Sequence, residues 1–193
     1  MTVLYRILLT AVAAGLAFGS PAVAQHAGHA APATAQPYAG QQMRAISSLS
    51  EADVKMLLAG GGWGLAKPAE LNGYPGPAHV LELADKLALT PQQKKRVEQI
   101  FKRMQMRAKS IGARYVAAEQ AIDEIFKSGK VETGSLQTRL RDTERLRSEL
   151  RRAHLVAHIE TTPLLSDEQR KKYAELRGYG GGHEHHQHQQ HKH

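Results

Sequence analysis

The chain has 193 residues, a formal net charge of +8 and no cysteine. The missing cysteine excludes disulfide bonds and thiol chemistry, and the length fits one domain with appendages. Aromatic residues make up only 5% of the chain and charged residues 23%, so we expect a thin, aliphatic core. The basic excess favours anionic partners, such as nucleic acid, a membrane surface or acidic protein segments.

The N-terminal stretch has the pattern of a secretory signal peptide. Arg6 precedes the apolar run Ile7–Phe18, and the small residues of Ala22–Ala24 resemble a cleavage site. The run is short for a membrane span, so an uncleaved anchor is the less favoured alternative. We predict cleavage after Ala24 and export, which argues against nucleic acid as a partner.

Two short helices are expected before the middle of the chain. Ser50 can cap a helix whose third residue, Asp53, is acidic, and Gly60–Gly62 would end it. A turn-rich segment follows, in which the only tryptophan, Trp63, is expected to close the end of a helical bundle. Pro77 is then placed to open a second short helix reaching Leu87.

A long helix is the clearest expectation. Thr90 is a good N-cap, Pro91 suits the first turn, and Gln93 can complete a capping box. The helix should end near Ser128–Gly129. Its apolar positions alternate in steps of four and three, which is the period of a helix that buries one stripe against another helix; they are Val97, Phe101, Met104, Ala108, Ile111, Tyr115, Ala118, Ile122 and Ile125.

The C-terminal half predicts a partner for that helix. Thr133 or Ser135 can cap a second long helix, and Thr162–Pro163 would disturb or end it. The short glycine-containing connection favours an antiparallel hairpin. Ser166 and Gln169 then repeat the cap pattern before a last helix. The expected fold is all-α, a long antiparallel helical hairpin with short flanking helices.

The expected organisation has four parts. A signal peptide at residues 1–24 is followed by a flexible leader at 25–49, which is rich in Ala, Pro, Gln and Gly. A helical domain at 50–179 and a histidine-rich disordered tail at 180–193 complete the chain.

Leu89-Thr90-Pro91-Gln92-Gln93 and Leu165-Ser166-Asp167-Glu168-Gln169 resemble the paired LTxxQ motifs of the periplasmic Spy/CpxP family. The second motif has serine for threonine, which keeps the capping hydroxyl. The family includes ATP-independent chaperones, envelope-stress regulators and zinc- or nickel/cobalt-binding resistance proteins. The resemblance covers roughly Ser50–Tyr179 and implies a periplasmic homodimer. It assigns helix caps and inter-helix contacts to Leu89, Thr90, Gln93, Leu165, Ser166 and Gln169.

A strongly basic segment begins the long helix. Eight basic residues and one acid, Glu98, lie between Lys94 and Arg114. Lysines in a first turn oppose the helix dipole, so stability alone does not favour them. The resemblance implies a basic concave face that holds unfolded envelope proteins by electrostatic attraction, and a sensor kinase or anti-sigma factor is a further partner it suggests. The alternative is a solvated face. The client-binding residues would be Lys95, Arg96, Lys102, Arg103, Arg107, Lys109 and Arg114.

Histidines suggest a second hypothesis, a periplasmic heavy-metal sensor or buffer for Zn, Ni, Co or Cu. His154 and His158 are four residues apart, so both imidazoles would lie on one helix face. Glu160, His79 or a partner chain could complete a site, whereas two polar histidines near a helix end are the simpler alternative. The tail adds His183, His185, His186, His188, His191 and His193.

No enzyme pattern is present in the sequence. There is no cysteine, nucleophile elbow, phosphate-binding glycine pattern or evident acidic pair. We therefore expect a binding protein that is not an enzyme and requires no cofactor, with zinc or another late transition metal as its candidate ligand.

Overall fold

Two long helices, α4 (Pro91–Lys127) and α5 (Thr133–Thr161), pack against each other in opposite directions, which confirms the predicted hairpin. The computed structural model describes residues 36–179, and the fold below belongs to the unit that begins at Tyr38. All of the regular elements in the described part are helical, apart from an isolated bridge between Ile46 and Leu49.

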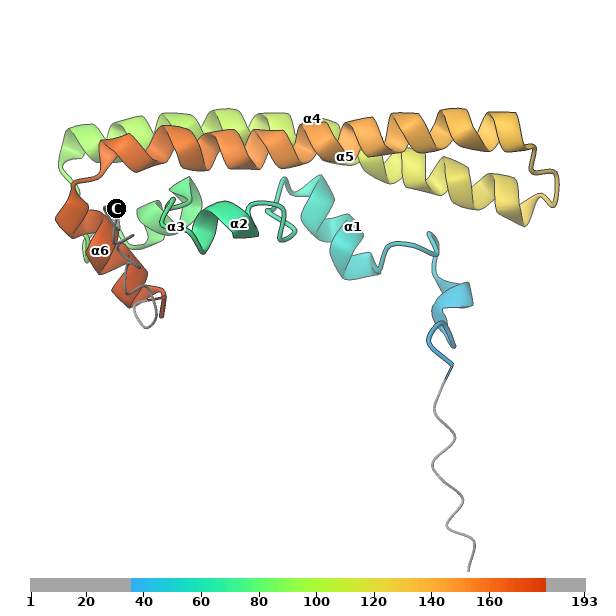
Figure 1. Ribbon diagram of the computed structural model, residues 1–193, viewed down its shortest axis with the longest axis horizontal. Helices are drawn as coiled ribbons and strands as arrows, with labels where there is room; N and C mark the ends of the chain where they lie inside the picture. The colour runs from blue at the N-terminus through green and yellow to red at the C-terminus, as the bar shows by residue number, and fades with distance from the viewer. Residues whose placement is uncertain (1–35, 180–193) are drawn as a thin grey trace, which may run out of the picture. The chain divides into compact units, whose positions relative to one another are not determined.

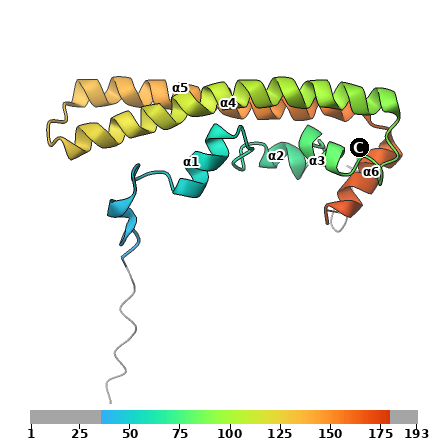
Figure 2. The ribbon, with the colours of Figure 1, turned by 180° about the vertical axis from the view of Figure 1, so that it is seen from behind.

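Short helices cover one side and one end of the hairpin. Helices α1 (Glu51–Leu58), α2 (Lys67–Glu70) and α3 (Pro77–Glu82) follow one another along it, as Figures 1 and 2 show from opposite sides. Helix α6 (Asp167–Leu176) lies where α4 begins and α5 ends. The 3-10 turns η1 and η2 complete the elements, at Gln41–Met43 and Thr162–Leu164.

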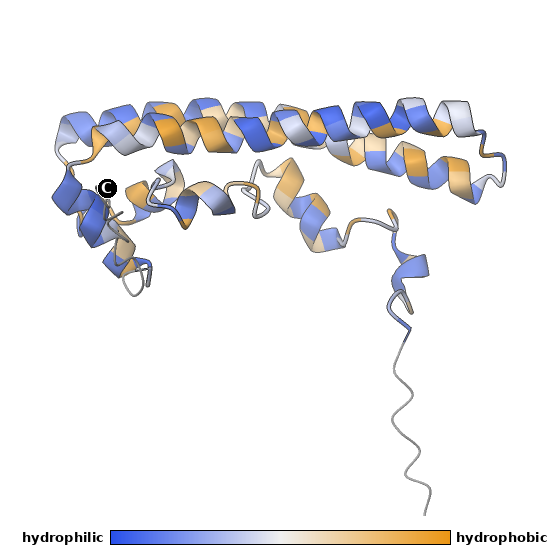
Figure 3. Ribbon diagram, in the orientation of Figure 1, coloured by the Kyte–Doolittle hydropathy of each residue, from blue (hydrophilic) through white to orange (hydrophobic). Residues whose placement is uncertain are grey.

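The buried surface of α4 is wider than the predicted stripe. Ile100, Gly112 and Val116 are buried beside the expected positions, because α4 packs against both α5 and α1. A Cβ atom at Gly112 would stand 2.4 Å from the carbonyl oxygen of Leu57, so glycine is what lets α1 approach α4 so closely. Figure 3 shows hydrophobic residues recurring at intervals along both long helices, as expected for helices buried on one side only.

Three helix starts were predicted with their correct caps. Ser50, Thr90 and Ser166 each accept a hydrogen bond from the backbone N–H three residues on, and each forms a complete capping box. The start of α5 was wrong, because its N-cap is Glu132, which makes no side-chain cap. The predicted second short helix was also too long, since α3 ends at Glu82 and turns continue to Ala88.

The folded region begins before residue 50. Ile46 and Leu49, expected in the flexible leader, are buried in the cluster that contains Leu57, Ile111 and Leu150. Composition alone did not indicate this contact, because the two apolar residues stand apart from each other in a polar stretch.

The two motifs meet at the α6 end of the hairpin. The Gln93 side-chain amide donates to Gln169 Oε1 at 2.8 Å and to the Leu164 carbonyl at 2.7 Å. The Gln169 amide donates in return to Gln93 Oε1 and to the Leu87 carbonyl, both at 3.2 Å. Each glutamine thus caps its own helix and also binds the segment before the other helix: Gln93 of α4 binds the segment before α6, and Gln169 of α6 binds the segment before α4.

Several predictions fall outside the described residues. The signal peptide, its cleavage after Ala24 and the tail histidines lie in residues 1–35 and 180–193. Among residues 36–179, none of the helices is long and apolar enough to cross a bilayer.

Candidate functional site

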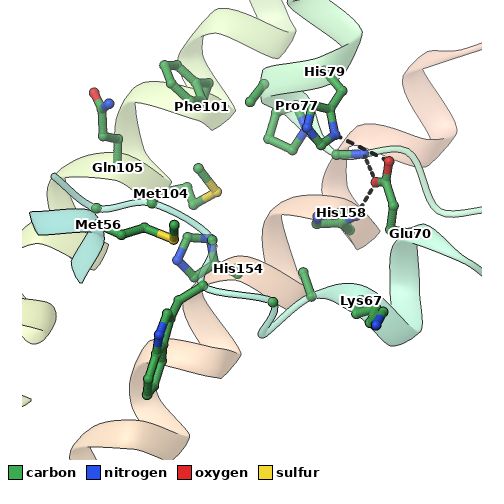
Figure 4. A pocket seen from close by; sticks show the side chains of 18 of the residues that line it. Met56, Lys67, Glu70, Pro77, His79, Phe101, Met104, Gln105, His154 and His158 are labelled. Carbon is green, nitrogen blue, oxygen red and sulfur yellow. Dashed lines mark hydrogen bonds and ion pairs between the residues drawn. The ribbon is translucent and has the colours of Figure 1, made fainter. Parts of the chain in front are cut away.

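A cavity of about 480 Å³ lies between the hairpin and the segment that carries α1 to α3. Its lining comes from the end of α1, the loop at residues 59–64, α2, α3 and one face each of α4 and α5. Figure 4 shows two groups of side chains in it. One is gathered around Glu70 and His158, and the other around His154.

Glycines let the loop lie against α4. Gly60 has a φ of +73°, and a Cβ atom there would stand 2.9 Å from the Gln105 carbonyl oxygen. The loop then reaches Trp63, whose φ of 44° is in the left-handed region that non-glycine residues rarely adopt. The indole holds this conformation by donating to Asp53 Oδ1 at 2.8 Å and by packing at 5.7 Å between ring centroids on Tyr115.

Trp63 therefore lies beside the body of α4 and not at the end of the bundle, contrary to expectation. Hydrogen bonds from Ser50 and then from Trp63 lower the pKa of Asp53, so its carboxylate stays ionised and keeps the indole in place.

Glu70 is the centre of the first group of cavity side chains. It is largely buried and accepts hydrogen bonds from the Tyr173 hydroxyl at 2.5 Å, from His79 Nδ1 at 3.2 Å and from the Gly76 N–H at 3.3 Å. Arg177 adds an ion pair at 3.4 Å. Burial, followed by the hydrogen bond to Glu70, raises the pKa of Tyr173, so the phenol remains a donor. This set of contacts joins α2 and α3 to α6.

His158 belongs to the same group. Its Nδ1 lies 2.7 Å from the Tyr74 carbonyl oxygen, and because a carbonyl only accepts, Nδ1 carries the proton. Its ring packs against Gly76, where a Cβ atom would come within 2.7 Å of it. The imidazole is therefore held in one orientation by the loop before α3.

His154, one turn earlier on α5, has different surroundings. It is only 3% exposed, and its Nε2 is buried without a hydrogen-bond partner. Burial, reinforced by the nearby His158, lowers the pKa of His154, while a hydrogen bond with the backbone of Gly61 opposes the shift. The ring is therefore neutral at neutral pH. Met56 and Met104 point toward it in Figure 4.

The two predicted metal-binding histidines thus line one cavity, although each has its own environment. In the described part of the chain, no group of three or more His, Asp and Glu side chains is placed to hold a metal ion. Glu160, named as a possible extra ligand, pairs instead with Arg103 at 2.9 Å. His79 faces Glu70.

The predicted client-binding side chains all lie on the surface of α4, and every one of them is exposed. Successive helical residues are rotated by about 100°, so the residues form two rows along α4. The first row follows α4 on the side of the loop at Gly60, and the second faces α5, as the pair between Arg103 and Glu160 shows. The first row is Lys95, Lys102 and Lys109, and the second is Arg96, Arg103, Arg107 and Arg114.

Sequence reasoning missed Glu70, Met56 and Met104 as site residues. Glu70 stands in a turn-rich segment, and Met104 was assigned only to the apolar stripe. A usable signal was the glycine run after Met56, since a run of glycines often marks a close approach between segments.

Searches against protein-family models, curated proteins and solved structures found no match to this chain.

Proposed function

We propose that this chain is a periplasmic, ATP-independent chaperone or envelope-stress protein of the Spy/CpxP type, which holds unfolded clients on the basic surface of α4. The observation that carries the proposal is the charge balance of that surface. Of its seven basic side chains, only Arg103 has an ion-pair partner within residues 36–179. Stability alone would favour intrahelical carboxylate partners, such as those that Arg145 and Arg147 have on α5.

Two further observations support the Spy/CpxP type. Thr90 and Ser166 form equivalent capping boxes, and Gln93 and Gln169 exchange hydrogen bonds, as expected of a paired structural motif. Exposed apolar side chains near the hairpin loop, at Phe126, Val131 and Leu140, support a homodimer formed through the hairpin.

The mechanism follows from the long, mobile side chains of lysine and arginine. Unpaired cations attract acidic client segments over about 8 Å at physiological salt, and flexible side chains adapt to many sequences. Their aliphatic stems also offer apolar contact. Binding of this kind is rapid and reversible and needs no nucleotide.

The test is aggregation of a denatured client, followed by light scattering without ATP and in the presence of a chelator. We expect the protein to suppress client aggregation, and the suppression to weaken as salt rises. Suppression should be lost in a variant in which five basic residues are changed to Gln, namely Lys95, Arg96, Lys102, Arg103 and Lys109. The matched control neutralises five exposed lysines elsewhere, at positions 55, 86, 130, 171 and 172. Equal suppression by both variants would refute the proposal.

A second candidate function is heavy-metal sensing or buffering. The observation in its favour is the cavity that places His154, with a free ring nitrogen, beside His158. Stoichiometric zinc, nickel or cobalt uptake, together with client protection only in the presence of metal, would favour this candidate over the first.

A further inference from the structure

Met56, Met104 and His154 come from three different helices and line the same cavity. Both thioether side chains point toward the imidazole, whereas the polar group around Glu70 lies on the other side of the cavity (Figure 4). The three residues are 48 and 50 positions apart in the sequence, so only the packing of α1 and α5 on α4 brings them together.

Gly61 is the point at which two of these residues meet. The Met56 side chain folds back over it, with its Cγ 2.7 Å from the position of a Cβ atom. The backbone of Gly61 also forms a hydrogen bond with His154. The missing side chain at this position therefore makes room for the thioether next to the ring.

The unpartnered Nε2 of His154 needs an explanation. A buried polar atom without a hydrogen bond costs about 1–3 kcal/mol, and proteins rarely leave one unsatisfied. The side chains of Met56 and Met104 point toward the ring in Figure 4, and their thioethers are poor hydrogen-bond partners but good ligands for soft metals.

We propose that Met56, Met104 and His154 form a binding site for a soft monovalent metal ion, Cu(I) or Ag(I). The inference rests on the metal-binding candidate of the preceding section and is independent of client binding. It specifies which residues of that candidate site would bind the metal and which class of ion they would select.

The charge of the site selects the class of ion. Two thioethers and a neutral imidazole carry no negative charge, and a buried divalent ion would need anionic ligands to offset its desolvation. Among residues 36–179, Glu70 is the only carboxylate that lines the cavity, and its oxygens already face Tyr173, His79 and Arg177. A soft monovalent ion suits the remaining donors, since thioether sulfur selects Cu(I).

The site also has an entrance. Met56 is 44% exposed, whereas Met104 is 9% exposed, so one methionine reaches the protein surface and the other is buried. A methionine that only filled the core would be buried. An ion can therefore first meet the exposed Met56 and then reach the buried Met104 and His154.

Trp63, the only tryptophan in the chain, lines the same cavity and provides a local reporter. The experiment titrates the full-length mature protein with Ag(I), a redox-inert probe, and follows tryptophan emission. The titration is run without zinc and then repeated with excess zinc, which would compete for His154 if the histidine-based candidate holds. We expect stoichiometric quenching. The result should be repeated with Cu(I) under reducing conditions, in competition with a chromogenic chelator.

The test variant is the double change Met56→Leu and Met104→Leu, which removes both sulfurs at nearly constant volume. The control is Met43→Leu with Met106→Leu, two exposed methionines outside the cavity. We expect at least about a hundredfold weaker Ag(I) binding in the test variant, about tenfold for each sulfur lost, and unchanged binding in the control. Circular dichroism will confirm that both variants fold.

Two outcomes separate this inference from the metal candidate. If zinc binds but Ag(I) leaves tryptophan emission unchanged, the thioether site is refuted and the histidine-based candidate survives. If neither ion binds, both are refuted. Equal Ag(I) affinity in the test and control variants would also overturn the assignment of Met56 and Met104.

Discussion

The two sides of the cavity differ although each contains a histidine from the same face of α5. On the His158 side, Glu70 of α2 accepts hydrogen bonds from Gly76, from His79 of α3 and from Tyr173 of α6, and it forms an ion pair with Arg177. Around His154 the neighbours are thioethers, and one ring nitrogen has no partner. The contrast separates a side chain that stabilises the fold from one that is available to a ligand. The predictions below test that contrast, from the largest expected change in stability to the smallest.

Glu70→Ala should be the most damaging change. It leaves the Tyr173 hydroxyl, His79 and Arg177 without their common acceptor, and hydrogen bonds to a charged group contribute about 1.5–3 kcal/mol each. We expect a loss of about 2–4 kcal/mol in the free energy of unfolding, measured with urea. Glu175→Ala, an exposed acid on the same helix as Tyr173, is the control and should change little. Equal effects would show that Glu70 is not the centre of the network.

Gly76→Ala tests how firmly His158 is held. The new methyl group would lie 2.7 Å from the imidazole, which the Tyr74 carbonyl keeps in place. Forcing an atom into a packed region costs about 1–3 kcal/mol, and thermal unfolding should report a loss in this range. A variant as stable as the wild type would mean that the ring moves freely.

The pH dependence of stability should reveal the burial of His154. In the unfolded chain this imidazole takes up a proton near its usual pKa of about 6.5, whereas burial keeps it neutral in the folded state. The unfolded state therefore binds more protons as the pH falls, so stability is lost below about pH 6.5 and is unaffected above it.

The matched variant for this measurement is His154→Gln. His158, His79 and Glu70 also line the cavity, so the relevant quantity is the difference between wild type and variant in urea unfolding at about pH 7 and pH 5. The wild type should lose more stability on acidification than the variant does. Parallel profiles would contradict a buried, neutral His154.

Gly61→Ala should change stability least and metal binding most. Its methyl group would displace the Met56 side chain, which is half exposed and free to swing outward. We expect a stability change within about 0.5 kcal/mol but clearly weaker Ag(I) quenching of Trp63. Gly62→Ala, where a Cβ atom would meet nothing, is the control. If quenching by Ag(I) is unchanged in Gly61→Ala, Met56 is not a ligand of the site.

Local signals allowed most of the fold to be predicted from the sequence. Helix caps depend on residues three positions apart, so Ser50, Thr90 and Ser166 could be assigned without knowledge of tertiary structure. The start of α5 was missed because Glu132 caps it only with its backbone conformation. The burial of Gly112 could not be predicted from the sequence, because the approach of Leu57 depends on another helix.

The cavity could not be predicted in the same way. Met56 and Met104 look like ordinary apolar helix positions, and Glu70 like a solvent-exposed acid in a turn. Their roles arise from contacts between residues far apart in the chain, such as the hydrogen bond between Tyr173 and Glu70. The histidine pair could be predicted because His154 and His158 lie on one helix. Their different surroundings could not, because these depend on residues from other helices.

The position of α6 has a consequence for the order of folding. The hairpin closes through the short connection at residues 128–132, whereas α6 is held by Gln93 and Glu70, 76 and 103 positions away from its contacting residues. Closing long loops costs more entropy than closing short ones, and local contacts form first. Helix α6 should therefore dock last and open first, and its amides should exchange with solvent faster than those in the middle of α4. Each opening would expose the Glu70 side of the cavity while the hairpin stays intact.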